Sequence, residues 1–196
     1  MKNFIKLFTI ACAFSAATAS ADPLMQYDYV DAAYQWTHAD EDGVDNLNGL
    51  DSRFSISPTQ YLALEAGYNY GGTEVLGTNV GLHTFAYGLA GWYDFCQNFH
   101  LVGRVGGLHQ DLNVGSGQPD DAEDGVYTNA QLRYLFTDEF EGDFDVTYIH
   151  LGGESGWNYG LTGLYALTES IALKVGSSID DDSNVSVLGG FRFALS

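Results

Sequence analysis

Three histidines and the acidic residues around them are the side chains of this 196-residue chain that could carry catalysis. His38, His109 and His150 stand toward the loop ends of alternating polar and apolar segments, where Asp40 or Asp111 could pair with His150. A histidine held by a carboxylate can act as a general base. However, no serine stands two residues after His150, where a His-x-Ser pair would need it, and no catalytic motif matches. We therefore predict a protein that is not an enzyme, with a hydrolase acting at the outer surface as an alternative.

Two acidic runs could bind divalent cations, because carboxylate oxygens are the ligands that Ca²⁺ and Mg²⁺ prefer. The spacing of the acids does not match an EF-hand loop. We predict a hydrated, charged surface without a cofactor, and weak association of Ca²⁺ or Mg²⁺ that bridges to anionic lipopolysaccharide is the alternative. The runs consist of Asp120, Asp121, Glu123 and Asp124, and of Asp180, Asp181 and Asp182.

Ten further charged residues lie within the alternating segments, always on the polar side of the alternation. In the hydrocarbon of a membrane each would cost a few kcal/mol near the midplane. Inside a narrow barrel they could pair with one another. We predict an internal charge network that packs and fixes the barrel, with a role in conduction as the alternative. Its residues are Asp31, Asp51, Arg53, Glu65, Arg104, Arg133, Asp143, Asp145, Lys174 and Arg192.

The elements that must position these side chains are strands, because the dominant period of the sequence is two. In residues 161–176, two alternating runs meet at the short polar turn 168–170, which predicts an antiparallel hairpin. Eight more segments alternate in the same way, so ten strands are predicted. They lie at 27–37, 47–57, 61–70, 79–93, 99–110, 125–135, 140–151 and 185–195, with two in 161–176.

The connections between these segments alternate in length. Short turns follow the even segments, whereas glycine- and aspartate-rich loops follow the odd ones, at 38–46, 71–78, 111–124, 152–156 and 179–184. This asymmetry is typical of outer-membrane barrels. Lipid offers no hydrogen bonds, so a spanning sheet must close on itself. The predicted fold is all-β: a closed, antiparallel, up-and-down transmembrane β-barrel of ten strands, with eight as the alternative and with strands too short to rise far above the membrane.

The apolar side of each strand is predicted to face lipid. The opposite side carries mostly small residues and single charges, which suit a narrow interior filled by its own side chains. Aromatic residues gather near the strand ends, as in the two girdles of membrane barrels. The loop-end set is Trp36, Tyr68, Tyr70, Tyr148, Trp157 and Tyr159, and the turn-end set is Tyr61, Tyr93, Tyr134, Phe144, Tyr165, Phe191 and Phe193.

The amino terminus reads as a secretory signal peptide at 1–21. Lys2 and Lys6 precede a short apolar run, and Ala19-Ser20-Ala21 provides a cleavage site. The rest, 22–196, is predicted to be one barrel domain. It keeps five of the seven basic residues against all 26 acidic ones, which argues against a nucleic-acid partner. Cys96 is its only cysteine, so no internal disulfide can form.

The last segment contains Gly189-Gly190-Phe191-Arg192-Phe193. This run is similar to the Gly-x-aromatic-x-aromatic insertion signal that the barrel assembly machinery reads. The chain thus resembles the small, porin-like outer-membrane β-barrels of Gram-negative bacteria, the OmpA-like and OmpX-like proteins. Those barrels usually end on Phe or Trp, whereas in this chain Ala194-Leu195-Ser196 follows.

The resemblance implies a monomer in the cell outer membrane. Its expected partners are the lipid bilayer, lipopolysaccharide and, during insertion, the barrel assembly machinery. We expect a structural, membrane-anchoring or surface-interaction role for a barrel with a filled lumen and acidic external loops. A small passive porin is the alternative.

Overall fold

The computed structural model describes residues 24–38, 46–75, 78–96, 98–114 and 121–195. The predicted signal peptide, 1–21, lies outside the described residues and stays a prediction. Within the described part of the chain, no helix is long and apolar enough to cross a membrane.

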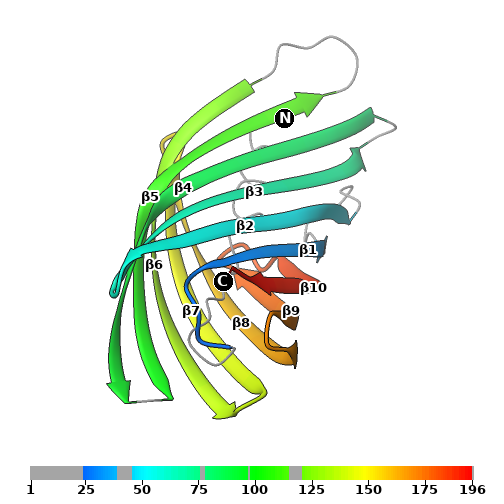
Figure 1. The fold of residues 1–196 in the computed structure, drawn as a ribbon. Helices are drawn as coiled ribbons and strands as arrows, with labels where there is room; N and C mark the ends of the chain where they lie inside the picture. The colour runs from blue at the N-terminus through cyan, green and yellow to red at the C-terminus, as the bar shows by residue number, and fades with distance from the viewer. Residues whose placement is uncertain (1–23, 39–45, 76–77, 97, 115–120, 196) are drawn as a thin grey trace.

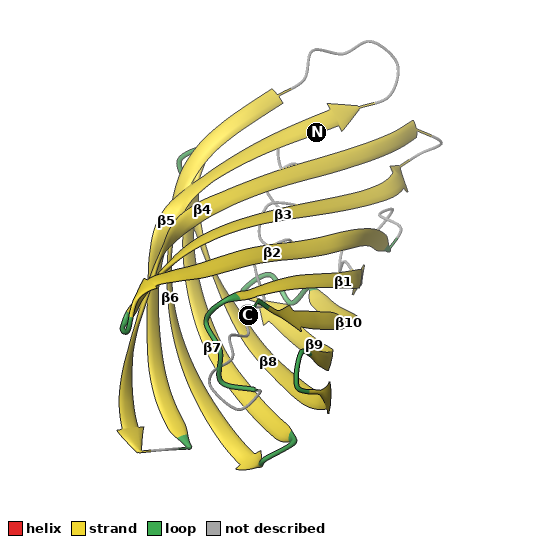
Figure 2. Cartoon of the chain, in the orientation of Figure 1, coloured by secondary structure: helices red, strands yellow, loops and turns green. Residues whose placement is uncertain are grey.

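Ten antiparallel strands form one closed barrel, with each strand paired to its neighbours in the chain and β1 paired to β10 (Figures 1 and 2). The ten-stranded prediction is confirmed, and the eight-stranded alternative is wrong. The strands are β1 (Tyr29–His38), β2 (Leu47–Thr59), β3 (Leu62–Val75), β4 (Thr78–Cys96), β5 (Phe99–Val114), β6 (Asp121–Thr137), β7 (Phe140–Leu151), β8 (Glu154–Thr168), β9 (Ile171–Asp180) and β10 (Val185–Ala194).

The alternation of the sequence becomes an alternation between the lumen and the outer surface. In β9, Leu173 and Val175 are exposed on the outside, whereas Lys174 between them is fully buried. Successive side chains of a strand point to opposite faces, so every strand repeats this pattern. The register between Tyr29–Ala194 and His38–Val185 closes the sheet and leaves no edge strand.

Tight turns join the strands at one end of the barrel, which we call the turn end; the lower part of Figure 1 shows the turns after β6 and β8. Two residues connect β6 to β7 and β8 to β9, and the threonine before each turn accepts backbone hydrogen bonds through its hydroxyl. The Thr137 hydroxyl accepts from the Phe140 amide and the Thr168 hydroxyl from the Ile171 amide, both at 3.1 Å. A register shift next to each turn marks a β-bulge.

The opposite end, the loop end, departs from the prediction because the strands are longer than expected. Residues predicted to be loops continue the ladder: Thr73 pairs with Val80, and Leu112 pairs with Asp121. The turn between β7 and β8 is only Gly152-Gly153, both with positive φ, a conformation that glycine adopts without strain.

The prediction of strands too short to rise above the membrane is therefore wrong. β4 has 19 residues and β6 has 17, whereas about 9–11 suffice to span a bilayer. Figure 1 shows β3 to β6 extending well past β1 and β10 at the loop end.

Candidate functional site: the barrel lumen

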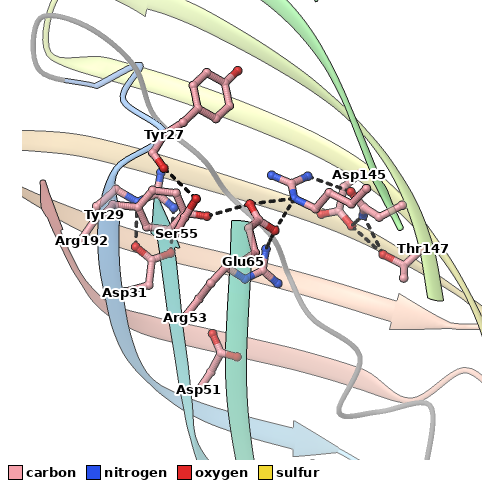
Figure 3. A network of polar contacts seen from close by, with 12 residues as sticks. Tyr27, Tyr29, Asp31, Asp51, Arg53, Ser55, Glu65, Asp145, Thr147 and Arg192 are labelled. Carbon is pink, nitrogen blue, oxygen red and sulfur yellow. Dashed lines mark hydrogen bonds and ion pairs between the residues drawn. The ribbon is translucent and has the colours of Figure 1, made fainter. Parts of the chain in front are cut away.

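All ten charged residues singled out in the sequence are buried inside the barrel, with at most 7% of any of them exposed. Figure 3 shows how several of them converge from different strands. Eight belong to one group, which we call the lumen network, and Arg133 and Asp143 belong to a second group nearer the turn end.

Asp31 is at the centre of the first part of the lumen network. Its two oxygens accept hydrogen bonds from Nε and Nη2 of Arg192, each at 2.7 Å, which is the bidentate geometry of a guanidinium and a carboxylate. Lys174 donates to the same carboxylate at 2.9 Å and lies 3.8 Å from Asp51. One aspartate of β1 thus joins β9 and β10 across the closing seam of the barrel.

Tyr29 and Glu65 extend the network from β1 to the opposite side of the seam. The Arg192 guanidinium lies 4.0 Å from the centre of the Tyr29 ring, and the Tyr29 hydroxyl donates to Glu65 at 3.4 Å. Glu65 in turn accepts from Nε of Arg104 at 3.0 Å and lies 3.9 Å from Arg53. Two guanidinium groups therefore share one glutamate.

Asn129 carries the network from β5 to β7. It accepts from Arg104 at 2.9 Å, and its amide donates to Asp145 at 3.1 Å and to Thr147 at 2.8 Å. The chain of contacts therefore follows the inner wall from Lys174 in β9, through the seam, to Asp145 in β7.

The second group is centred on Arg133, which pairs with Glu141 and lies 3.5 Å from Asp143. Glu141 was not predicted from the sequence, although it is fully buried and shares its parity with Asp143 and Asp145. Glu141 comes directly after the turn that contains the exposed acids Asp138 and Glu139, so it was not recognised as an internal residue. Parity alone could have found it.

Residues 24–28 form a short segment before β1, which we call the N-terminal strap, and it was not predicted. Tyr27 was expected in the first strand. Instead, its ring stacks on Trp92 with the centroids 3.6 Å apart, its hydroxyl is 3.1 Å from Nδ1 of His100, and the Arg133 guanidinium lies 5.0 Å from its centre. Leu24 packs against Leu164 and Ala172.

The strap crosses the lumen. Trp92, His100 and Arg133 belong to β4, β5 and β6, and β6 is five strands away from β1 in both directions around the barrel. At its base the strap is held by the Ser55 hydroxyl, which donates to the Tyr27 carbonyl at 2.7 Å (Figure 3). The turn end of the lumen is therefore obstructed by chain as well as by side chains.

The rim histidines at the loop end make different contacts from those expected. Asp111 lies 3.4 Å from His109, not against His150, and Asp124 lies 2.8 Å from the other ring nitrogen of His109. The reason is register, because His109 stands opposite Asp124 and two residues from Asp111 on the same face of β5. The predicted partner Asp40 lies outside the described residues.

The other two histidines have uncharged partners. The His38 ring lies 2.8 Å from the Asn46 side chain, and His150 lies 2.8 Å from the Ser155 hydroxyl. Ser155 also accepts a hydrogen bond from the Tyr148 hydroxyl at 2.9 Å. His150 and Ser155 thus form a histidine–serine contact at this rim, which is the pairing that a surface hydrolase would need.

The acidic runs form no metal site within the described residues, where no three His, Cys, Asp or Glu side chains are placed to hold an ion. Asp120 and the side chain of Asp121 lie outside the described part of the chain. Asp180 stabilises the β9–β10 loop by accepting from the backbone amides of Asp182 at 3.0 Å and Asn184 at 2.8 Å. Cation association therefore stays a prediction.

The outer surface is apolar and aromatic. Near the turn end the rings follow one another around β4 to β7, with Tyr93 5.0 Å from Phe95, and Phe136 4.8 Å from Tyr134 and 5.5 Å from Phe140. At the loop end, Trp36, Tyr68 and Trp157 are exposed. All five lysine and arginine residues of 22–196 are inside the barrel, so the described outer surface carries neither residue type.

No family model matches the sequence, and no curated protein matches it. Several solved outer-membrane proteins share its fold. The NanC porin has a TM-score of 0.55 at 12% identity, over 85% of this chain and 100% of that one. The outer membrane protein OprG from Pseudomonas aeruginosa has a TM-score of 0.50 at 10% identity, over 90% of this chain and 99% of that one. The chain is therefore an outer-membrane β-barrel in fold, as its resemblance implied.

Proposed function

We propose that this protein is an integral outer-membrane barrel with a closed lumen and a structural, anchoring or surface-interaction role. The observation that carries the proposal is the N-terminal strap, whose Tyr27 crosses the lumen from β1 and stacks on Trp92. Above it, the lumen network occupies the inner wall with large paired side chains. In outer-membrane barrels the short turns face the periplasm, so the strap closes the periplasmic mouth.

The contacts of His150 and Ser155 at the rim support a protein that is not an enzyme. A nucleophilic catalytic site needs three groups: a nucleophile, a base and a group that orients the base. His150 and Ser155 lie within hydrogen-bond distance, but the serine is also bonded to Tyr148, and both residues sit exposed on the outer surface. Incubation with a fluorophosphonate probe should leave Ser155 unlabelled. Labelling that is lost in Ser155→Ala would favour the surface hydrolase instead.

The proposal includes the partners expected for such a barrel: the bilayer, lipopolysaccharide and the assembly machinery, with the barrel itself a monomer. Phe191 and Phe193 are 44% and 42% exposed on the outer face of β10, where an assembly machine could read them with Gly189. Because no lysine or arginine of 22–196 lies on the outer surface, divalent cations would strengthen contact between its acidic loops and lipopolysaccharide phosphates.

Planar-bilayer recording of residues 22–196 tests the closed lumen. Mature protein that shows the usual mobility difference between boiled and unboiled samples should give no stable unitary current. Tyr27→Ala, which detaches the strap from Trp92 and His100, should raise the leak. Stable, sizeable unitary currents from the unchanged protein would overturn the proposal and favour a small passive porin, the function named for the NanC porin.

A further inference from the structure

A groove of about 600 Å³ runs over the outer face of the barrel from the turn end toward mid-height. Its volume is within the roughly 300–1,000 Å³ of small-molecule sites. Aromatic rings line the groove near the turn end, and aliphatic side chains line it nearer the middle of the barrel. The side chains that shape it are Tyr134, Phe136, Phe140, Leu161, Val175 and Val187.

Two glycines create the groove. Gly142 of β7 and Gly163 of β8 are register partners, and both positions point outward. A Cβ atom at Gly142 would lie 2.7 Å from the Phe136 ring, and one at Gly163 would lie 3.3 Å from the Phe140 ring. The rings of Phe136 and Phe140 therefore pack against the backbone of these two glycines. A larger side chain at either position would fill the groove.

The turns next to the groove are anionic. Asp138 and Glu139 stand exposed in the turn between Phe136 and Phe140, whose rings both line the groove, and Glu169 is exposed in the next turn. Every lysine and arginine of 22–196 is inside the lumen. A ligand whose tail lies in the groove would thus meet carboxylates, and no basic side chain, at its head.

We propose that the groove binds one phospholipid with a primary-ammonium headgroup from the periplasmic leaflet. The acyl chain lies over Gly142 and Gly163, because this surface faces hydrocarbon. The ammonium group lies beside Asp138 and Glu139, where charge complementarity selects it over an anionic headgroup. The site rests on the proposed function, since it requires the barrel to span the outer membrane with its turns in the periplasm.

Native mass spectrometry of the lipids retained by the protein tests the site. Residues 22–196 are reconstituted into nanodiscs of equal parts phosphatidylethanolamine and phosphatidylglycerol and then released into mild detergent. We expect one retained lipid, with phosphatidylethanolamine enriched at least about threefold. Gly163→Leu should abolish retention, whereas Gly103→Leu should not, because Gly103 points outward into open space and does not line the groove.

A second pair of variants separates the head from the tail. Asp138→Asn with Glu139→Gln should keep the retained lipid but bring the two headgroups to equal amounts. Asp182→Asn, at the loop end, should leave the preference intact. If Gly163→Leu does not insert, Ser177→Phe fills the groove from β9, since Ser177 is an exposed lining residue.

Retention at the bulk ratio by the unchanged protein, enrichment of phosphatidylglycerol, or retention that survives both groove-filling variants would overturn the site. These results would not contradict the proposed barrel with a closed lumen, because the mobility difference first shows that each sample is inserted. An open channel would instead show in the conductance measurement and would not alter lipid retention.

Discussion

At the residue scale, the seam between β1 and β10 depends on Asp31. Asp31 is fully buried and forms ion pairs with both Lys174 and Arg192. A buried ion pair is not by itself a source of stability, because desolvation offsets most of the attraction. Its removal is different, since the partners stay behind as buried charges.

Asp31→Asn is therefore expected to lower the free energy of unfolding by about 3–5 kcal/mol. Urea titration of the protein in lipid vesicles, followed by the mobility difference, measures the change. Asp182→Asn is the control, because Asp182 is exposed at the loop end. A cost at Asp31 no larger than that of the control would mean that the seam is not held by this carboxylate.

Two glycines of β5 offer a matched test of close packing. Gly106 faces the lumen, where the Tyr127 ring lies against it and an added Cβ would meet the backbone carbonyl of Tyr87. Gly103 faces open space. Gly106→Ala should cost about 1–3 kcal/mol, and Gly103→Ala should stay within about 0.5 kcal/mol. Equal effects in the same urea assay would contradict the close approach of Tyr127.

At the element scale, the N-terminal strap is the part of the chain that closes the lumen at the turn end of the barrel. It is only residues 24–28, but its contacts reach β4, β5, β6, β8 and β9. Trp92 is covered on one face by Tyr27. Its fluorescence therefore reports whether the strap is seated.

With Trp36 and Trp157 replaced by phenylalanine, Trp92 should be poorly quenched by aqueous iodide. Tyr27→Ala should raise the quenching severalfold, since the stacked ring that excludes water is lost. Phe144→Ala, on the outer face of β7, is the control and should leave Trp92 unchanged. Strong quenching before any substitution at Tyr27 would show that the strap does not cover the lumen.

Strand positions could be predicted because period two is carried by many residues at once. The same is true of the side that meets lipid: Leu173 and Val175 outside with Lys174 inside is a pattern that repeats around the barrel. The strap could not be predicted, because five residues before a strand carry no period. Tyr27 was assigned to the first strand for that reason.

Neither the lengths of the strands nor the partners of the charged residues in the lumen could be predicted from the sequence, for two different reasons. Glycine and aspartate near Thr73 and Asp121 are weak strand formers, yet the ladder continues through them because each strand is templated by its neighbour. Pairing inside the lumen depends on how far side chains reach around the wall. Arg104 meets Glu65 two strands away, a contact that neighbouring positions in the sequence do not encode.

At the scale of the whole molecule, the end of β10 bears on how the barrel reaches the membrane. Phe193 and Phe144 are similarly exposed, at 42% and 45%, but only Phe193 belongs to the predicted insertion signal. With the purified assembly machinery in vesicles, Phe193→Ala should insert several times more slowly than Phe144→Ala. Both should fold alike in bare vesicles, and equal rates with the machinery present would remove the signal from this segment.

The orientation of the two faces of the sheet underlies every proposal made for this barrel, and β9 allows the most direct measurement. Single nitroxide labels at residues 171–178, in vesicles, report collision with oxygen, which concentrates in hydrocarbon. Oxygen accessibility should rise and fall with a period of two, with maxima at Leu173, Val175 and Ser177 and minima at Ala172, Gly176 and Ser178. Maxima on the opposite positions, or no alternation, would contradict a barrel that turns its apolar face to lipid and its charges to the lumen.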